Sequence, residues 1–473
     1  MNAPLQPQTS GFKRGGYLTN TAREIEVFFL RYRTIVSLVH VGMFVLFVGL
    51  LAVPLFLETP PEDASALNNF TNFANMLIWG VWFPLVFVSV IVTGRSWCGL
   101  LCPMGAASEW ANKIGFKRAI PKWVQWPGTP VVTFVFVTIW AQTVGARDHA
   151  AAMAIVFGTT MLAAILLGLF FGRDKRAWCR HMCPIGLALG VYSRMGAVDF
   201  RPKRPKEGER LWTEKTACPT MIDLPRKIES RHCIECFKCV QPRAKGGLYM
   251  RLRKPGEEIA TIRRHNANLS EIMFLFLGTG TAIGGFLWLV LNSYQSLRHS
   301  IGNFVIEKEW YWLAEPGPIW LMSNYPAERE VFRWLDFFLI SGYMLSWAAG
   351  IALVLSIVTG VSAWISGKLG GTGTDRQRFV ELGYQFLPIA MISLLLGLGS
   401  GLFETLATLG LNDAAVSGVK GAGFVGGALW SAWLGARLLQ QQGVARNKLW
   451  MAMWPGLIGT AAVGAAWAPA LFS

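Results

Sequence analysis

All eight cysteines of this 473-residue chain fall into three groups whose spacing suits metal ligation or thiol redox chemistry. Two groups are Cys-x3-Cys-Pro motifs, and the third is an isolated Cys-Pro pair followed by a Cys-x2-Cys-x2-Cys run. The groups are Cys98 with Cys102, Cys179 with Cys183, and Cys218 with Cys233, Cys236 and Cys239. Because no cysteine is left over for ordinary packing, the pattern indicates redox metal centres.

The third group can be compared with a bacterial two-cluster ferredoxin. In each C-x2-C-x2-C-x3-C-P run of such a protein, the fourth cysteine binds the cluster of the other run. Here Cys218-Pro219 matches the end of a first run, and Cys233 begins a second. The ligand positions of the other cluster hold Gly208, Leu211, Glu214 and Arg243. One ligand set is therefore absent and one is complete, which predicts a single [4Fe–4S] cluster bound by Cys218, Cys233, Cys236 and Cys239. A structural zinc ion is the alternative.

The two Cys-x3-Cys-Pro motifs belong to a longer internal repeat. Residues 94–105 and 172–186 carry Gly-Arg, Trp-Cys and Cys-Pro-x-Gly in the same order, which matches Arg95 with Arg173. Residues four apart share one helix face, and the proline predicts that the helix ends at the second cysteine. Packed together, two such ends would present four thiols. Cys98, Cys102, Cys179 and Cys183 would then form a second metal or iron–sulfur site, or two redox-active thiol pairs.

Membrane-spanning helices are needed to position these motifs. With 53% hydrophobic and 15% charged residues, the chain has the composition of a membrane protein. Nine apolar stretches come close to the roughly 20 residues that cross a bilayer. They lie at about 35–57, 75–94, 128–146, 151–172, 271–292, 336–359, 385–405, 423–440 and 449–470. The expected fold is an all-α polytopic membrane protein of about nine transmembrane helices with a small cytoplasmic ferredoxin-like insert.

The distribution of Lys and Arg predicts the orientation, because cytoplasmic loops carry an excess of these residues. The N-terminal tail and the loop after the second apolar stretch are basic, whereas the loop after the first holds Glu58, Glu62 and Asp63. The N-terminus, both repeated motifs and the insert are therefore expected on the cytoplasmic side of a bacterial inner membrane. Reducing conditions there argue against disulfides. We recognise no removable signal peptide.

Four parts are expected along the chain. They are a cytoplasmic tail (1–34), duplicated transmembrane hairpins that each end in a cysteine motif (35–186), the [4Fe–4S] insert (187–270) and a C-terminal membrane region (271–473). The last part has about five helices and a periplasmic loop near 293–335, whose aromatic and acidic residues suit an interfacial belt or a partner-docking surface. The net charge of +16 serves topology and contact with membrane lipid, and no nucleic-acid partner is expected.

These motifs carry a resemblance to a known group. The duplicated Trp-Cys-x3-Cys-Pro-x-Gly segment, residues 217–223 and residues 233–236 resemble the membrane polyferredoxin-like proteins. That family includes NapH- and NosR-type quinol dehydrogenase-like proteins and the copper-reducing assembly factor of cbb3 oxidases. The resemblance covers about residues 35–245. The layout is most similar to the polyferredoxin-type subunit of periplasmic ferrous-iron uptake systems. The chain departs from the family in lacking the first ferredoxin cluster and an evident periplasmic flavin-binding domain.

The resemblance implies an electron-transfer protein rather than a self-contained enzyme. It would pass electrons between a periplasmic partner, such as a ferrous-iron uptake system, and the cytoplasm or the quinone pool. The alternatives are a quinol dehydrogenase-type donor to a periplasmic reductase, a copper or iron reductase that uses the Cys-x3-Cys-Pro thiols, and a transporter with a sensing cluster. The direction of electron flow stays open because [4Fe–4S] potentials span a wide range. His40, an ionisable residue inside the first helix, is a candidate haem ligand, quinone contact or proton group.

Overall fold

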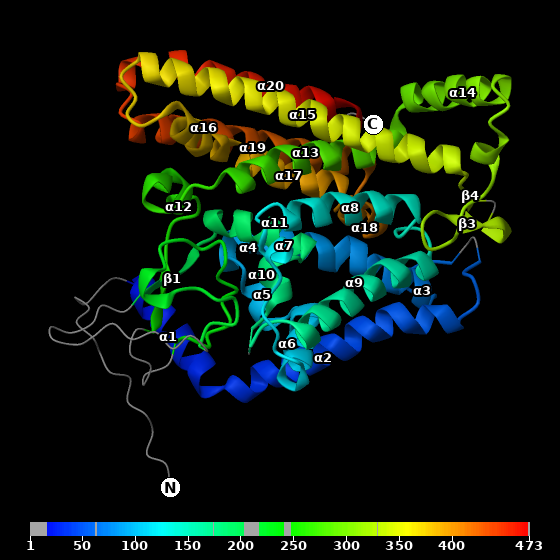
Figure 1. The fold of residues 1–473 in the computed structure, drawn as a ribbon, viewed down its shortest axis with the longest axis horizontal. Coiled ribbons are helices and arrows are strands. Elements are labelled where there is room, and N and C mark those ends of the chain that lie inside the picture. Colours follow the sequence, from blue (N-terminus) through cyan, green and yellow to red (C-terminus); the bar gives the residue numbers. More distant parts are fainter. Residues whose placement is uncertain are drawn as a thin grey trace, which may run out of the picture.

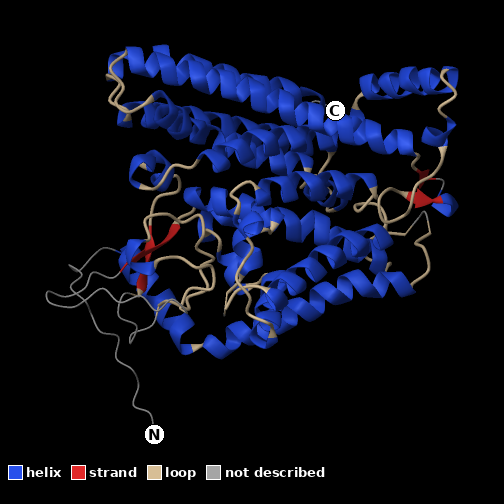
Figure 2. Cartoon of the chain, in the orientation of Figure 1, coloured by secondary structure: helices blue, strands red, loops and turns tan. Residues whose placement is uncertain are grey.

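The computed structural model describes residues 17–61, 64–173, 175–202, 217–240, 247–328 and 330–471. Outside these ranges lie Glu62 and Asp63 of the acidic loop and the four absent ligand positions, Gly208, Leu211, Glu214 and Arg243. Most of the described residues are helical, and the few strands are short (Figures 1 and 2). The predicted all-α polytopic membrane fold is confirmed.

Seven helical segments of the described residues are long and apolar enough to cross a membrane. They are α2–η1 (Arg33–Ala52, Val53–Phe56), α3–η2–α4 (Phe70–Asn75, Met76–Trp82, Phe83–Thr93), α9 (Ala150–Phe170), α13 (Leu269–Val290), α15 (Trp334–Lys368), α16–η8–α17 (Asp375–Gly383, Tyr384–Phe386, Leu387–Gly397) and η9–α20 (Arg446–Lys448, Leu449–Leu471). The other two predicted stretches are also helical, as α8 (Thr129–Thr143) and α19 (Asp413–Gln441). α8 is shorter than a full span, and α19 is rich in small and polar residues.

Shorter elements connect and cap these spans. The helices are α1 (Tyr17–Arg31), α5 (Ser96–Leu100), α6 (Pro103–Ile114), α7 (Lys122–Gln125), α10 (Ala177–His181), α11 (Pro184–Tyr192), α12 (Glu257–Ala260), α14 (Asn292–Glu307) and α18 (Gly401–Thr408). The strands are β1 (Val198–Pro202), β2 (Leu248–Leu252), β3 (Asn324–Tyr325) and β4 (Glu330–Val331). β1 pairs antiparallel with β2, and β3 with β4. Because β1 pairs with β2, the chain enters and leaves the insert at neighbouring positions.

The long helices form two layers (Figure 1). α13, α15, α17, α19 and α20 pack on one another in the C-terminal layer, and α2, α4, α8 and α9 lie in the N-terminal layer. α13 joins the layers because it contacts both α8 and α15. Glycine allows α13 and α15 to pack closely. A Cβ on Gly280 of α13 would lie 2.4 Å from the carbonyl oxygen of Trp347 in α15.

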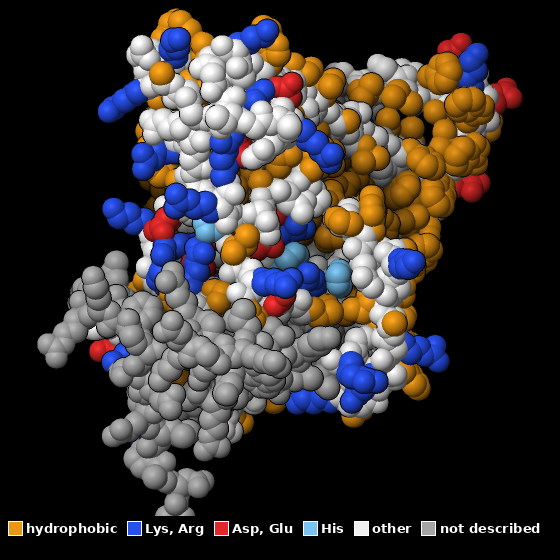
Figure 3. Space-filling view, turned by 60° about the vertical axis from the view of Figure 1, so that its left-hand side comes forward, with side chains coloured by type: hydrophobic (Ala, Val, Ile, Leu, Met, Phe, Trp, Pro, Cys, Tyr) orange, Lys and Arg blue, Asp and Glu red, His pale blue; other side chains and the backbone are white. Residues whose placement is uncertain are grey.

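The two ends of the helical bundle differ in character. β1, β2 and α12 lie at one end, here the insert end, and α14, β3 and β4 lie at the opposite end, here the α14 end (Figure 1). Lys and Arg side chains gather on the insert end (Figure 3). Arg226 of the insert and Lys254, which follows β2, are both exposed. This distribution is the one expected of a cytoplasmic face.

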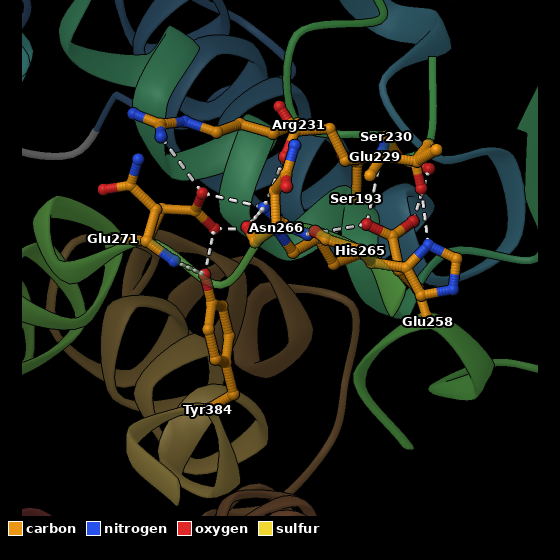
Figure 4. A network of polar contacts seen from close by, with 12 residues as sticks. Ser193, Glu229, Ser230, Arg231, Glu258, His265, Asn266, Glu271 and Tyr384 are labelled. Atoms are coloured by element: carbon orange, nitrogen blue, oxygen red, sulfur yellow. Dashed lines mark hydrogen bonds and ion pairs between the residues drawn. The ribbon is translucent and has the colours of Figure 1, made fainter. Parts of the chain in front are cut away.

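A buried ionic network fixes the insert to the membrane helices (Figure 4). Arg194, which follows α11, donates to Glu258 of α12 at 2.8 Å and to Glu271 of α13 at 2.7 Å. Tyr384 donates to the same Glu271 at 2.9 Å, and Arg231 of the insert pairs with it at 3.1 Å. Because buried charges are costly unless they are paired and hydrogen-bonded, this network favours one orientation of the insert.

Candidate iron–sulfur centres

The four cysteines of the insert line one small cavity. They are Cys218, Cys233, Cys236 and Cys239. Apolar side chains, among them Phe200 and Leu248, form most of the remaining wall. The structure therefore brings the predicted ligand set together in a site that largely excludes water. Four cysteine thiolates around such a cavity fit a [4Fe–4S] cluster.

The backbone of the ligand loop is tightly wound. Glu235 and Phe237 have positive φ angles of 54° and 55°. Non-glycine residues adopt this conformation where the surrounding structure holds them, often at functional sites. The Ile222 N–H donates to Cys218 Sγ at 3.4 Å, and hydrogen bonds to sulfur tune cluster potentials. Burial raises the pKa of Cys233 to about 12, so metal binding at this thiol is coupled to release of a proton.

The zinc alternative and the cluster require different arrangements of the four sulfurs. No three His, Cys, Asp or Glu side chains of the described residues are arranged to hold a single metal ion. In a zinc site, all four sulfurs lie about 2.3 Å from one ion. In a four-iron cluster each sulfur binds a different iron, so the ligands surround a larger volume.

The two cysteines of each Cys-x3-Cys-Pro motif lie on different helices. Cys98 lies in α5 and Cys179 in α10, whereas Cys102 and Cys183 are the N-caps of α6 and α11. The first helix ends two residues before the second cysteine in both motifs, so the predicted end at that cysteine is wrong by two residues. The following proline instead begins the next helix, a position for which its fixed φ is suited. The N–H three residues after the second cysteine donates to its Sγ, at 3.4 Å for Cys102 and 3.2 Å for Cys183.

Two arginines join the repeats to each other. Arg95, three residues before Cys98, donates to the Cys179 carbonyl oxygen at 2.8 Å. Arg176, three residues before Cys179, donates to the Cys98 carbonyl oxygen at 2.9 Å. A Cβ on Gly105 would lie 3.3 Å from Cys179 Sγ, so the first motif also touches the second directly. The four cysteines of the repeats, which we call the membrane-edge cysteines, therefore belong to two motifs that contact each other, two cysteines from each repeat.

Sequence alignment of the repeats missed this pair of arginines. Gly94 and Gly172 do match, since both follow a membrane helix with positive φ, 59° and 87°. The partner of Arg95 is nevertheless Arg176 and not Arg173, because the second repeat has three extra residues before it. Counting backwards from the first cysteine of each motif would have found both arginines.

The insert rests on both repeats at once. On α5, a Cβ at Gly99 would lie 2.0 Å from the Ile234 carbonyl oxygen and 2.8 Å from the Cys236 backbone nitrogen. On α10, Arg180 occupies the position that corresponds to Gly99 and donates to the Thr220 carbonyl oxygen at 2.6 Å. The two ligand-bearing loops of the insert thus each touch one cysteine helix. The loops that carry the insert cysteines therefore lie against the helices that carry Cys98 and Cys179.

Charged groups surround the contact between the two cysteine sets. Glu109 of α6 accepts a hydrogen bond from Arg176 at 2.6 Å and pairs with Lys238 of the insert. Burial opposes the ionisation of Glu109, but the charges of Arg176 and Lys238 hold its pKa at about 2. Burial also raises the pKa of Cys102 to about 12 and that of Cys179 to about 11. Without metal these thiols are protonated near neutral pH and are poor nucleophiles.

His40 contacts the same region through the backbone of the first motif. Its Nε2 lies 3.1 Å from the carbonyl oxygen of Gly99, between the two cysteines of the first motif. The side chain is buried in α2. This contact gives His40 a part in holding α5 in place.

A larger cavity begins at the membrane-edge cysteines and extends toward the α14 end. Cys98, Cys102 and Cys183 line one part, and Gln142 and Arg147 line another. The walls are almost entirely apolar and rich in aromatic side chains, including Trp79, Trp82, Phe83, Trp97, Phe134, Phe157 and Trp178. An apolar cavity with few polar groups is typical of a site for an apolar small molecule.

Comparison with known families supports an iron–sulfur protein. Residues 75–121 and 153–207 match the family described as a 4Fe-4S binding domain. The matched segments contain both Cys-x3-Cys-Pro motifs and end before Cys218. Fold and comparison together describe a polytopic membrane protein that is similar, over residues 75–121 and 153–207, to the 4Fe-4S binding domain family.

Several curated proteins are similar to about a third of this chain. NirI of Paracoccus denitrificans is 28% identical over 186 residues, which cover 34% of this chain and 26% of NirI. Regulatory protein NosR of Pseudomonas aeruginosa is 24% identical over 186 residues, or 33% of this chain and 26% of NosR. Ferredoxin-type protein NapH of Escherichia coli is 23% identical over 168 residues, or 31% of this chain and 58% of NapH.

These matches confirm the predicted resemblance to the membrane polyferredoxin-like family of NapH and NosR type. The match spans only about a quarter of the length of NirI and of NosR. No solved structure shows a significant match to the chain.

Proposed function

We propose that this chain is a membrane electron-transfer protein with two adjacent iron–sulfur centres. Cys218, Cys233, Cys236 and Cys239 would bind one [4Fe–4S] cluster, and the four membrane-edge cysteines would bind the second centre. When bound, such centres take up and release single electrons. The observation that carries the proposal is the contact of the insert with both cysteine helices, at Gly99 and Arg180.

The protein itself supplies spacing, orientation and charge. The β1–β2 pair and the network around Glu271 hold the insert in one orientation. The missing side chain of Gly99 allows the Cys236 loop to approach the first motif. Arg95 and Arg176 place positive charge beside the membrane-edge cysteines. Electrons would enter or leave through the insert on the cytoplasmic side and pass between the two centres.

A periplasmic partner, such as a ferrous-iron uptake system, is the proposed exchange partner at the α14 end. Exposed aromatic side chains there, Trp310, Tyr311, Trp312 and Trp320, are suited to a membrane interface or to protein docking. The metal-reductase and transporter alternatives have less support. The pKa values of Cys102 and Cys179 are raised, and no group of three His, Cys, Asp or Glu side chains in the described residues is arranged to hold a single metal ion.

A quinol dehydrogenase-type role is the second candidate, and the large apolar cavity favours it. A quinone combines a flat ring with an apolar tail, which suits aromatic walls that end at the cysteines. Ala141→Phe would fill part of this cavity. It should slow reduction of the centres by a soluble quinol while leaving reduction by dithionite unchanged, as followed by visible absorbance. Equal rates with the quinol in wild type and variant would argue against this role.

The test of the main proposal is metal analysis of the full chain purified without oxygen, combined with EPR of the reduced protein. Cys236→Ser should remove the insert signal and its iron, whereas Cys183→Ser should remove the membrane-edge signal and leave the insert signal. Each variant is the matched control for the other. Unchanged iron and EPR in Cys236→Ser, or zinc in place of iron, would contradict the insert assignment.

A further inference from the structure

Buried positive charges in this protein almost always meet a carboxylate. Seven Arg and Lys side chains are buried in the described part of the chain, and six of them form an ion pair. The pairs are Arg176–Glu109, Arg194–Glu271, Lys227–Asp199, Arg231–Glu271, Arg253–Glu258 and Arg378–Asp375. Figure 4 shows part of this pairing around Glu271. The pattern follows the rule that a buried charge requires an opposite charge.

Arg95 is the seventh buried cation, and its guanidinium meets sulfur and carbonyl groups instead. The residue is only 2% exposed. Nε donates to Cys98 Sγ at 3.4 Å, Nη1 to the Arg231 carbonyl oxygen at 2.9 Å and Nη2 to the Cys179 carbonyl oxygen at 2.8 Å. Among the described residues it forms no ion pair with a carboxylate. Glu235 accepts a hydrogen bond from the backbone N–H of Arg95.

This arrangement requires negative charge at the membrane-edge cysteines. A guanidinium does not lose its proton in a protein, so the charge of Arg95 is permanent. A buried charge without a partner is strongly destabilising. Four neutral thiols would leave Arg95 without an opposite charge, whereas thiolates bound in an iron–sulfur centre would supply that charge. The contacts of this side chain are therefore an argument, independent of cysteine spacing, for negative charge at the site.

We propose that Arg95 is the counter-charge of an anionic iron–sulfur centre at the membrane-edge cysteines and raises the reduction potential of that centre. The inference rests on the proposed function. Each one-electron reduction, with the electron supplied by the insert cluster, adds one negative charge and breaks no bond. A fixed positive charge in contact with the site stabilises the reduced form more than the oxidised form. Net charge and hydrogen bonds to sulfur are among the determinants of cluster potential.

The repeat provides a comparison within the same molecule. Arg176 occupies the position of Arg95 in the second repeat, but Glu109 balances its charge at 2.6 Å. Beside the insert cavity, the buried Lys227 is balanced by Asp199 at 3.5 Å. Loss of Arg95 thus changes the net charge next to the membrane-edge site and should affect the insert cluster much less. The insert cluster can therefore act as an internal reference.

The experiment is an EPR-monitored redox titration of the full chain in detergent, without oxygen, for wild type, Arg95→Lys and Arg95→Gln. Lys keeps the charge while losing the planar fork of donors, and Gln keeps a polar side chain without the charge. In Arg95→Gln the midpoint of the membrane-edge signal should fall by at least the equivalent of a tenfold change in the reduction equilibrium, about 59 mV for one electron. Arg95→Lys should stay close to wild type, and the insert midpoint should move little in both variants.

Iron content decides the case in which a variant fails to assemble. Loss of membrane-edge iron in Arg95→Gln together with retention in Arg95→Lys supports the counter-charge. Loss in both variants, or equal midpoints in wild type and Arg95→Gln, overturns it and leaves only a positioning role through the hydrogen bonds. Equal iron contents in wild type and Cys183→Ser would contradict the proposal that the membrane-edge cysteines bind an iron–sulfur centre. Equal midpoints with the centre present refute only the role of Arg95.

Discussion

The eight cysteines divide into two sets that share no member and yet lie side by side. Within the membrane-edge set, each motif is held against the backbone of the other through Arg95 and Arg176. A ligand taken from either repeat should therefore disturb the same site. The insert set has its own cavity and its own loops.

For the membrane-edge set, we expect Cys98→Ser and Cys179→Ser to cause equal losses of the membrane-edge EPR signal and of electron transfer. The double variant should add little, because residues that act as a unit are strongly non-additive. The insert signal, recorded in the same samples, should survive and is the control. Losses that multiply in the double variant would indicate two separate dithiols.

Helices α5 and α10 are the elements on which the proposed electron path depends. Each is about one turn long and is followed by a cysteine that caps the next helix. The repeats add reciprocal backbone bonds, from the Phe116 N–H to the Leu169 carbonyl at 2.7 Å and from the Ala197 N–H to the Ile91 carbonyl at 2.9 Å. These bonds fix the repeats relative to each other, so the insert meets a preformed surface.

Gly99 is the position on that surface where a single methyl group should matter. In Gly99→Ala the new Cβ would overlap Ile234 and Cys236 backbone atoms and push the ligand loop away. We expect a loss of about 1–3 kcal/mol in stability from overpacking. We also expect weaker magnetic coupling between the two reduced centres, measured as reduced splitting or broadening of their EPR signals.

Gly158→Ala is the matched control for that change. Gly158 lies within helix α9, and no neighbouring atom lies within 4 Å of the place that its Cβ would take, so alanine there should be neutral or slightly stabilising. Its EPR signals should equal those of wild type. Unchanged coupling in Gly99→Ala would show that the two centres do not communicate through this contact.

At the scale of the whole molecule, the insert end and the α14 end should face opposite sides of the membrane. The basic character of the insert end predicts that it is cytoplasmic. A labelling site at the α14 end should not disturb the helices. Asn69 caps α3 through its side chain, so a substitution there would remove the cap. Leu67 nearby is 95% exposed and is a better probe position.

A membrane-impermeant maleimide should label Leu67→Cys in intact cells, because that residue would face the periplasm. Lys254→Cys, exposed at the insert end, should be labelled only after the membrane is opened. The wild-type chain, whose eight cysteines are buried or partly buried, gives the background. Labelling of Lys254→Cys from outside would reverse the orientation and move the proposed electron entry to the periplasm.

The sequence by itself determined the features that depend on neighbouring residues. Apolar stretches of bilayer length predicted nine membrane-spanning helices. All nine stretches are helical among the described residues, and seven of them are long and apolar enough to span a membrane. The cysteine spacing predicted which of the eight residues would gather in the insert. Proline after each second cysteine predicted a break in the helix, although the break comes two residues earlier than expected. The length of an apolar stretch, the spacing of cysteines and the effect of a proline all depend on nearby residues. They can therefore be inferred from the sequence alone.

Only the tertiary structure decided how the two cysteine sets face each other. The contact of Gly99 with Cys236 joins positions 137 apart in the chain, and Arg95 reaches Cys179 across 84 positions. Aligning Gly94-Arg95 with Gly172-Arg173 gave the wrong counterpart for Arg95. The second repeat has three extra residues, which leave the sequence similarity intact but make Arg176 the arginine that contacts the other motif. Burial gives these contacts their chemical meaning. An arginine is ordinary in a sequence. We infer an anionic centre from Arg95 because its buried guanidinium meets sulfur and carbonyl groups, and no carboxylate, among the described residues.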